Sequence, residues 1–194
     1  MTATRRDTGA IAAICVVAGA AVLVSLAVAP GLAGVLGAAL ALDVLAIAVI
    51  DARHFIIPDE LTIAALVLGM VNAGLDAWPD GWSAVFPSIG MALMRGAVLA
   101  GTFFALRALY ARLRGREGIG LGDVKLAGAG GVWLAWTTIP VAIEIAALGA
   151  LAVYVVRQVA GGKMMSATAR MPFGLFLAPA LWLGWVLEQT LFGT

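Results

Sequence analysis

Long apolar segments follow one another along this chain and are separated by short polar stretches. A helix needs about 20 mostly apolar residues to cross roughly 30 Å of hydrocarbon. The pattern therefore predicts an all-α, polytopic membrane helix bundle with about seven transmembrane helices. The predicted spans cover residues 10–29, 31–50, 61–75, 85–106, 124–137, 140–156 and 172–192.

The division of residues 124–156 into two spans rests on Pro140, because this apolar stretch is too long for a single span. A proline lacks the backbone N–H and its ring clashes with the preceding helical turn, so we place the break at Thr138-Ile139-Pro140. The longest polar stretch, residues 107–123, predicts a loop. No linker or internal repeat is visible, which predicts a single domain over residues 1–194.

Basic residues predict which ends of the spans face the cytoplasm, because cytoplasmic loops carry an excess of Lys and Arg. With the N-terminus in the cytoplasm, the connections 30–31, 76–84 and 138–139 lie outside and contain neither Lys nor Arg. Trp133 and Trp136 then fall at the outer end of the fifth span, where aromatic residues favour the headgroup layer. The basic residues of the cytoplasmic pieces are Arg5, Arg6, Arg53, Arg107, Arg112, Arg114, Arg116, Arg157, Lys163 and Arg170.

The composition narrows the classes of function. Of the 194 residues, 63% are apolar and 12% are charged, about half the charged share of roughly 25% in soluble domains. This excludes a soluble globular enzyme and a disordered chain, and a net charge of +1 provides no basic surface for nucleic acid. Cys15 is the only cysteine and His54 the only histidine. We therefore expect no disulfide, no metal site and no cofactor.

Two segments at the predicted cytoplasmic boundary each carry an aspartate. Asp51 begins the connection between the second and third spans, and Asp123 directly precedes the fifth span. Two carboxyl groups that lie close together share one proton, because their pKa values move apart. The ionised partner can then activate water, and the protonated partner can polarise a scissile carbonyl and protonate the leaving amine. This pattern predicts a carboxylate pair that acts without a metal.

The glycines before Asp123 favour the same interpretation. Gly118, Gly120 and Gly122 remove side chains where an extended peptide could lie close to the backbone. Asp123 also starts a helix, whose dipole favours the charged carboxylate. The alternative is a glycine-rich turn followed by an N-capping aspartate without catalytic role. Lys125 either lowers the pKa of Asp123 or extends to the inner headgroups.

Three stretches of the sequence resemble the type IV prepilin peptidase family of GxGD intramembrane aspartyl proteases. They are IDARHFIIPDELT, in which Asp51 precedes Pro58, then GIGLGDVKL, which contains Asp123 and Lys125, and MPFGLFLAPA over residues 171–180. The resemblance covers residues 42–180 and implies one transmembrane peptidase domain with this core. It also implies that Asp51 and Asp123 are the catalytic pair. The substrate-binding and loop residues would be Pro58, Gly118, Gly120, Gly122 and Lys125.

The resemblance further implies a substrate and a location. It implies removal of the leader peptide from prepilins or pilin-like proteins at the cytoplasmic face of the inner membrane. The partners of this protein would be these substrates and the lipid bilayer, with no nucleic acid. Its oligomeric state stays open. The family's CxxC-bearing insert is missing here, which implies peptidase activity without N-methylation, as in short members associated with Flp-type pili. Leu175 stands where the family often has proline.

Two other functions stay open. Pro179-Ala180-Leu181 also matches the PAL motif of presenilin and signal-peptide-peptidase-like GxGD proteases. A small transporter or assembly scaffold could instead use Asp43, Arg95 and Glu144 as an intramembrane ion path, since such charges are costly unless used.

The remaining acidic and basic residues within the predicted bundle have structural interpretations. We expect Asp43, Glu144 and Arg95 to be buried interhelical partners, and the sequence leaves open which acid meets Arg95. Asp59 follows Pro58 and opens the third span, so we expect it to N-cap that helix rather than to be the first catalytic aspartate.

Overall fold

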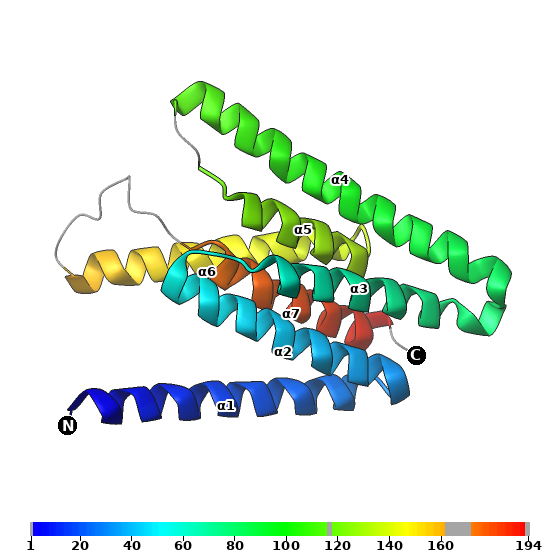
Figure 1. The fold of residues 1–194 in the computed structure, drawn as a ribbon, viewed down its shortest axis with the longest axis horizontal. Coiled ribbons are helices and arrows are strands. Elements are labelled where there is room, and N and C mark those ends of the chain that lie inside the picture. Colours follow the sequence, from blue (N-terminus) through cyan, green and yellow to red (C-terminus); the bar gives the residue numbers. More distant parts are fainter. Residues whose placement is uncertain (1, 116–117, 162–171, 193–194) are drawn as a thin grey trace.

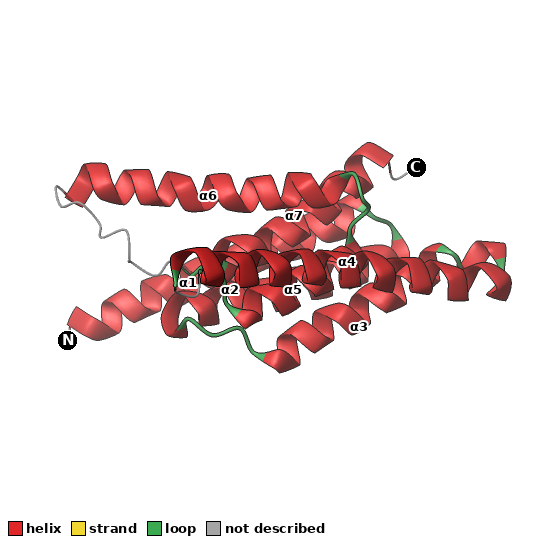
Figure 2. Cartoon of the chain, turned by 90° about the horizontal axis from the view of Figure 1, so that it is seen from above, coloured by secondary structure: helices red, strands yellow, loops and turns green. Residues whose placement is uncertain are grey.

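A computed structural model describes residues 2–115, 118–161 and 172–192, and these contain seven α-helices and no strand (Figures 1 and 2). The helices confirm the predicted all-α bundle, and each predicted span corresponds to one helix. They are α1 (Thr2–Val28), α2 (Gly31–His54), α3 (Asp59–Asp76), α4 (Trp82–Arg114), α5 (Leu121–Trp133), α6 (Thr138–Gly161) and α7 (Gly174–Phe192), with a 3-10 turn, η1 (Trp78–Asp80), before α4.

Among the described residues, α1, α2, α4 and α6 contain segments long and apolar enough to cross a membrane. The count of seven spans and the cytoplasmic N-terminus stay predictions. Of the basic residues used to orient the chain, Arg116, Lys163 and Arg170 lie outside the described residues, and the side chains of Arg5 and Arg6 are not described.

The short helix α5 forms the centre of the bundle. It packs against α3, α4 and α7, while α2 packs against α1, α3 and α7, and α6 packs against α7 (Figure 1). From Leu126 onwards every residue of α5 is buried. Its glycines explain this, because a Cβ at Gly131 would lie 2.8 Å from the carbonyl oxygen of Arg95 in α4. Small residues let two helix backbones approach this closely.

Helix ends depart from the predictions at three places. Residues 107–114 were predicted as loop, but α4 continues to Arg114 and ends at Gly115, whose φ of 65° provides the left-handed cap. Leu, Ala and Arg in this stretch are strong helix formers, and only the glycine stops the helix. Likewise α2 continues to His54, which puts Asp51 in its last turn. The break between α5 and α6 lies at residues 134–137, and Pro140 occupies the first turn of α6, where its missing N–H costs little.

Trp133 belongs to the core, so its predicted place in the headgroup layer is wrong. Its indole N–H donates to the carbonyl oxygen of Ala65 at 2.7 Å, and its ring meets that of Trp185 edge-on with centroids 6.4 Å apart. Gly69 and Gly37 make room for these rings, because a Cβ at either position would overlap with Trp133 or Trp185. A buried indole is favourable when its N–H finds an acceptor.

The acid near Arg95, which the sequence leaves open, is neither Asp43 nor Glu144, and the expected burial of Glu144 is wrong. Arg95 donates to the carbonyl oxygens of Gly131 and Val132 at 3.3 and 3.4 Å, and the acid that interacts with it electrostatically is Glu188 of α7. Glu144 is exposed, while Asp43 is buried with one carboxylate oxygen that has no hydrogen-bond partner among the described residues. Sequence spacing cannot reveal this arrangement because α4, α5 and α7 are distant along the chain.

The packing of α4 on α5 predicts a specific effect of Gly131→Ala. The added methyl group meets backbone atoms of Arg95 and Gly96 at 2.8 Å, and backbone cannot move aside without separating the helices. We expect a loss of stability of about 1–3 kcal/mol, typical of overpacking, measured by thermal unfolding in detergent. Gly101→Ala in α4 is the control, because a Cβ there meets nothing within 4 Å. Equal stability of the two variants would contradict this packing.

The predicted topology has its own test. Seven spans with a cytoplasmic N-terminus put a reporter fused after Thr194 outside the cytoplasm. We expect a periplasmic alkaline phosphatase reporter at this position to be active, and one fused after Gly115, in a predicted cytoplasmic piece, to be inactive. Activity of the second fusion but not of the first would overturn the orientation.

Candidate active site

Asp51 lies at the contact between the end of α2 and the start of α7. Its side chain is buried, with 5% exposed, and its Oδ2 accepts a hydrogen bond from the amide of Leu175 at 2.9 Å. The amide of Gly174 donates to the same carboxylate. A Cβ at Gly174 would lie only 2.8 Å from Asp51 Oδ2, so the approach requires glycine. Sequence reasoning missed this contact because a backbone amide leaves no side-chain signal.

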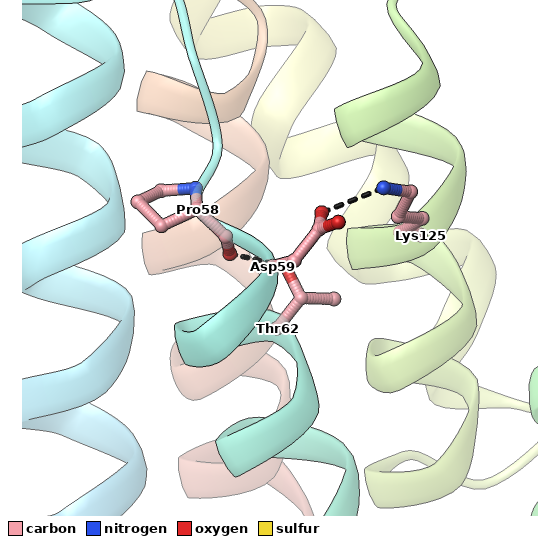
Figure 3. Close-up of polar contacts among 4 residues, drawn as sticks. All are labelled: Pro58, Asp59, Thr62 and Lys125. Carbon is pink, nitrogen blue, oxygen red and sulfur yellow. Dashed lines mark hydrogen bonds and ion pairs between the residues drawn. The ribbon is translucent and has the colours of Figure 1, made fainter.

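The connection from α2 to α3 is shaped by three residues. Phe55 closes α2 in the left-handed conformation, with φ 56°, and its N–H donates to the carbonyl oxygen of Asp51 at 2.9 Å. Ile57 is buried. Pro58 is extended and precedes α3, and its carbonyl oxygen accepts from the hydroxyl of Thr62 at 3.1 Å (Figure 3). Pro58 therefore anchors the first turn of α3.

Asp123 sits in the first turn of α5. The residue that caps α5 is Gly120, so the N-capping role predicted for Asp123 is wrong. Its Oδ2 instead accepts a hydrogen bond from the Gly120 amide at 3.2 Å, which is the reciprocal half of a capping box. The extended backbone of Gly120, with φ −71° and ψ 151°, allows this turn.

Ile57 joins the two aspartate-bearing regions. A Cβ at Gly122 would lie 3.0 Å from the Ile57 Cβ, and a Cβ at Gly174 would lie 2.7 Å from the Ile57 Cδ1. The Ile57 side chain therefore lies between the start of α5 and the start of α7. The end of α2 and the starts of α5 and α7 lie at the same end of the bundle (Figure 1), so the structure brings Asp51 and Asp123 to that end.

Asp123 precedes the fifth predicted span, and its environment favours the neutral carboxyl. Burial raises the pKa of Asp123 to about 6, the Gly120 hydrogen bond lowers it, and the negative charge of Asp51 raises it further. The two aspartates therefore interact electrostatically. A carboxyl whose pKa is raised toward neutrality and that interacts with a second carboxylate is an arrangement used for acid–base catalysis.

Lys125 and Asp59 form an ion pair beside this site, with Nζ and Oδ1 2.6 Å apart (Figure 3). The expectation that Asp59 N-caps α3 is wrong, because Pro58 holds the cap position and no side chain caps the helix. This ion pair differs from the two predicted roles of Lys125, which were to lower the pKa of Asp123 or to extend to the inner headgroups. Both side chains are about half exposed, so the pair contributes at most about 1 kcal/mol to stability.

The ion pair borders a cavity that the sequence did not reveal. The cavity has a volume of 510 Å³ and lies between α3, α4 and α5. A run of small residues in α4 was its only sequence signal. Its apolar lining includes Leu66, Leu93, Gly96, Ala97, Ala100 and Val132.

The predicted loop glycines occupy different surroundings. A Cβ at Gly118 would lie 2.5 Å from the ring of Tyr110, and one at Gly122 would meet Ile57. These two glycines therefore accommodate side chains of the chain itself, and their contact with a substrate stays a prediction. Within the residues that the structure describes, no three His, Cys, Asp or Glu side chains form a possible metal site.

Comparison with known proteins relates this geometry to a family. The profile of the Type IV leader peptidase family matches residues 38–156, more than half of the chain. No solved structure matches.

Named relatives cover the same region. The chain is 37% identical over 135 residues to the prepilin leader peptidase/N-methyltransferase of Burkholderia pseudomallei strain 1026b, covering 69% of this chain and 40% of the relative. It is 32% identical over 135 residues to that of Escherichia coli K12, covering 70% and 55%. It is 35% identical over 130 residues to leader peptidase HopD of Escherichia coli, covering 67% and 78%. With its all-helical fold and these matches, the chain belongs to the type IV leader peptidase family.

Proposed function

We propose that this chain is a membrane-embedded aspartyl endopeptidase that removes the leader peptide from prepilins or pilin-like proteins. Cleavage takes place at the cytoplasmic face of the inner membrane, and Asp51 and Asp123 are the catalytic residues. The convergence of these two aspartates at one end of the bundle carries the proposal. Their electrostatic interaction and the family membership support it, and the names of the relatives supply the substrate class.

The reaction is hydrolysis of one amide bond. One carboxylate removes a proton from water, and the water oxygen attacks the scissile carbonyl carbon. The other carboxyl donates a hydrogen bond to the carbonyl oxygen and then gives its proton to the amine nitrogen as the C–N bond breaks. The products are the leader with a new carboxyl group and the mature subunit with a free amine.

The proposal does not include N-methylation. The names of the Burkholderia relative and the K12 relative join peptidase and methyltransferase, and this chain spans 40% and 55% of their lengths. HopD is named as a leader peptidase alone, and the chain covers 78% of its length. The sequence also has a single cysteine and so contains no CxxC pair.

Neither alternative function gains a supporting contact. The ion path of a transporter would need Asp43, Arg95 and Glu144 together, but Arg95 binds carbonyl groups of α5 and Glu144 is exposed. The Pro179-Ala180-Leu181 segment lies inside α7. Leu181 there packs against Gly130, which accounts for the tripeptide by core packing.

Replacing either aspartate tests the proposal. We expect Asp51→Asn and Asp123→Asn to reduce cleavage of a purified prepilin substrate in detergent by at least about 10²–10⁴-fold, because each removes one acid–base group. Both variants remain folded, because the side-chain carbonyl of asparagine can accept the same backbone hydrogen bonds. Asp59→Asn is the matched control, since it removes a carboxylate at the same end, and it keeps its activity. Full activity of both variants would remove the protease assignment, and loss in Asp59→Asn with activity in Asp51→Asn would move the first catalytic position.

The pH dependence follows from the raised pKa of Asp123, about 6. Catalysis needs one protonated carboxyl, and a raised pKa means that this proton is kept to higher pH than usual and is lost as the pH rises through the folded value. We expect kcat/KM to fall as the pH rises above about 6, measured between pH 5 and 8 for wild type. A rate that increases steadily over this range would contradict the assignment of the proton to Asp123.

A further inference from the structure

The two aspartates receive different numbers of backbone hydrogen bonds. Asp51 accepts from the amides of Gly174 and Leu175, and these are the first two residues of α7. The first amides of a helix have no partner within the helix and lie at the positive end of its dipole. A hydrogen bond to a charged acceptor is about twice as strong as one to a neutral acceptor. Burial disfavours the ionised form of Asp51, and the two amides at the start of α7 offset part of that penalty.

Asp123 receives less support for its charge. Among the described residues, the amide that bonds to its carboxylate is that of Gly120, at 3.2 Å, against 2.9 Å for Leu175 and Asp51. The negative charge of Asp51 acts against a second ionised group beside it. Of the pair, Asp123 is the carboxyl that retains the proton.

Few other charges face the pair among the described side chains. The side chains described for α1, from Thr8 on, include no charged residue, and the one acid of α7, Glu188, bonds to Ala135 near the far end of α5. On α2, Arg53 is exposed. On α3 and α5, Asp59 and Lys125 hold each other, while Glu60 is exposed. On α4, Arg107 donates to the carbonyl oxygen of Ile119, four residues before Asp123. The backbone amides of α7 thus act on Asp51 and not on Asp123.

We propose that the amides of Gly174 and Leu175 hold Asp51 as the ionised carboxylate, so that Asp51 activates the water and Asp123 supplies the proton. This inference rests on the proposed function. Asp51 takes one proton from water as the C–O bond forms, and Asp123 gives one proton to the leaving nitrogen as the C–N bond breaks. Gly174 and Leu175 are positioning residues, because they act through Asp51 and not on the substrate.

The test removes one amide without removing a side-chain function. Leu175→Pro deletes the N–H that bonds to Asp51, and a first helical turn tolerates proline. Leu175→Ala is the matched control, because it shortens the same side chain and keeps the amide. The measurement is the pH dependence of kcat/KM for cleavage of a purified prepilin substrate in detergent. Its acidic limit reports protonation of the base, and its alkaline limit reports loss of the proton from the acid.

We expect Leu175→Pro to move the acidic limit upward by about one pH unit, because a charge-assisted hydrogen bond is lost. The alkaline limit stays in place, and Leu175→Ala keeps both limits of the wild type. Identical limits in the proline and alanine variants would overturn the inference, as would a shift of the alkaline limit alone. If the proline variant does not fold, an amide-to-ester replacement at Leu175 removes only the donor, and the same outcomes apply.

Gly174→Ala provides a second readout. Its methyl group would meet Asp51 Oδ2 at 2.8 Å and Ile57 Cδ1 at 2.7 Å, so we expect a loss of cleavage. Adding Ile57→Val removes the Cδ1 contact alone, and rescue by this second change would show that Gly174 acts by packing, which overturns its role. Failure of the inference leaves Asp51→Asn inactive, whereas failure of the proposed function leaves it active, so the two are distinguishable.

Discussion

The hydrogen bond between Asp51 and the start of α7 is the constraint on which the arrangement of the bundle depends. A buried carboxylate is unfavourable unless hydrogen-bond donors replace the lost water. Here the donors come from the start of α7, and one of them, Leu175, lies 124 residues later in the chain. Since α7 has to start at this point, it lies along α2 and covers α5, with Trp185 filling the space over Gly37. The end of the bundle that carries the two aspartates and the core are therefore joined by the same contact.

The helix α5 carries the second aspartate into the same region because it is short and rich in small residues. Glycines at 128, 130 and 131 bring α4 and α7 against its backbone, so its position cannot vary without loss of packing. Ile57 links the position of α5 to the segment that follows Asp51, since its side chain fits between Gly122 and Gly174. The separation of the two aspartates is thus determined by apolar packing, and their charge states by backbone amides.

Sequence patterns predicted the helices and the two aspartate segments because apolar length and local spacing are properties of neighbouring residues. The contacts that the sequence did not reveal join distant elements. Lys125 and Asp59 are 66 positions apart, and either residue alone is equally compatible with a cap or with a solvent-exposed charge. Trp133 stands near the end of a predicted span, which is typical of a headgroup residue. Its indole N–H instead donates to the carbonyl of Ala65 in the core. Helix ends were misplaced where strong helix formers followed an apolar span, as in residues 107–114.

The two polar features at this end of the molecule face different ways from α5. Asp123 and Lys125 are two positions apart, which is roughly 200° around a helix. Lys125 faces α3 and the apolar cavity, and Asp123 therefore points to another side of α5. The body of α5 is packed in the core, so both side chains lie at its N-terminus. That N-terminus begins at Gly120, where the absence of a side chain leaves the Asp123 carboxylate accessible to its own backbone amide. Gly120 thus keeps the Asp123 carboxyl in place, while Lys125 borders the cavity from the same helix.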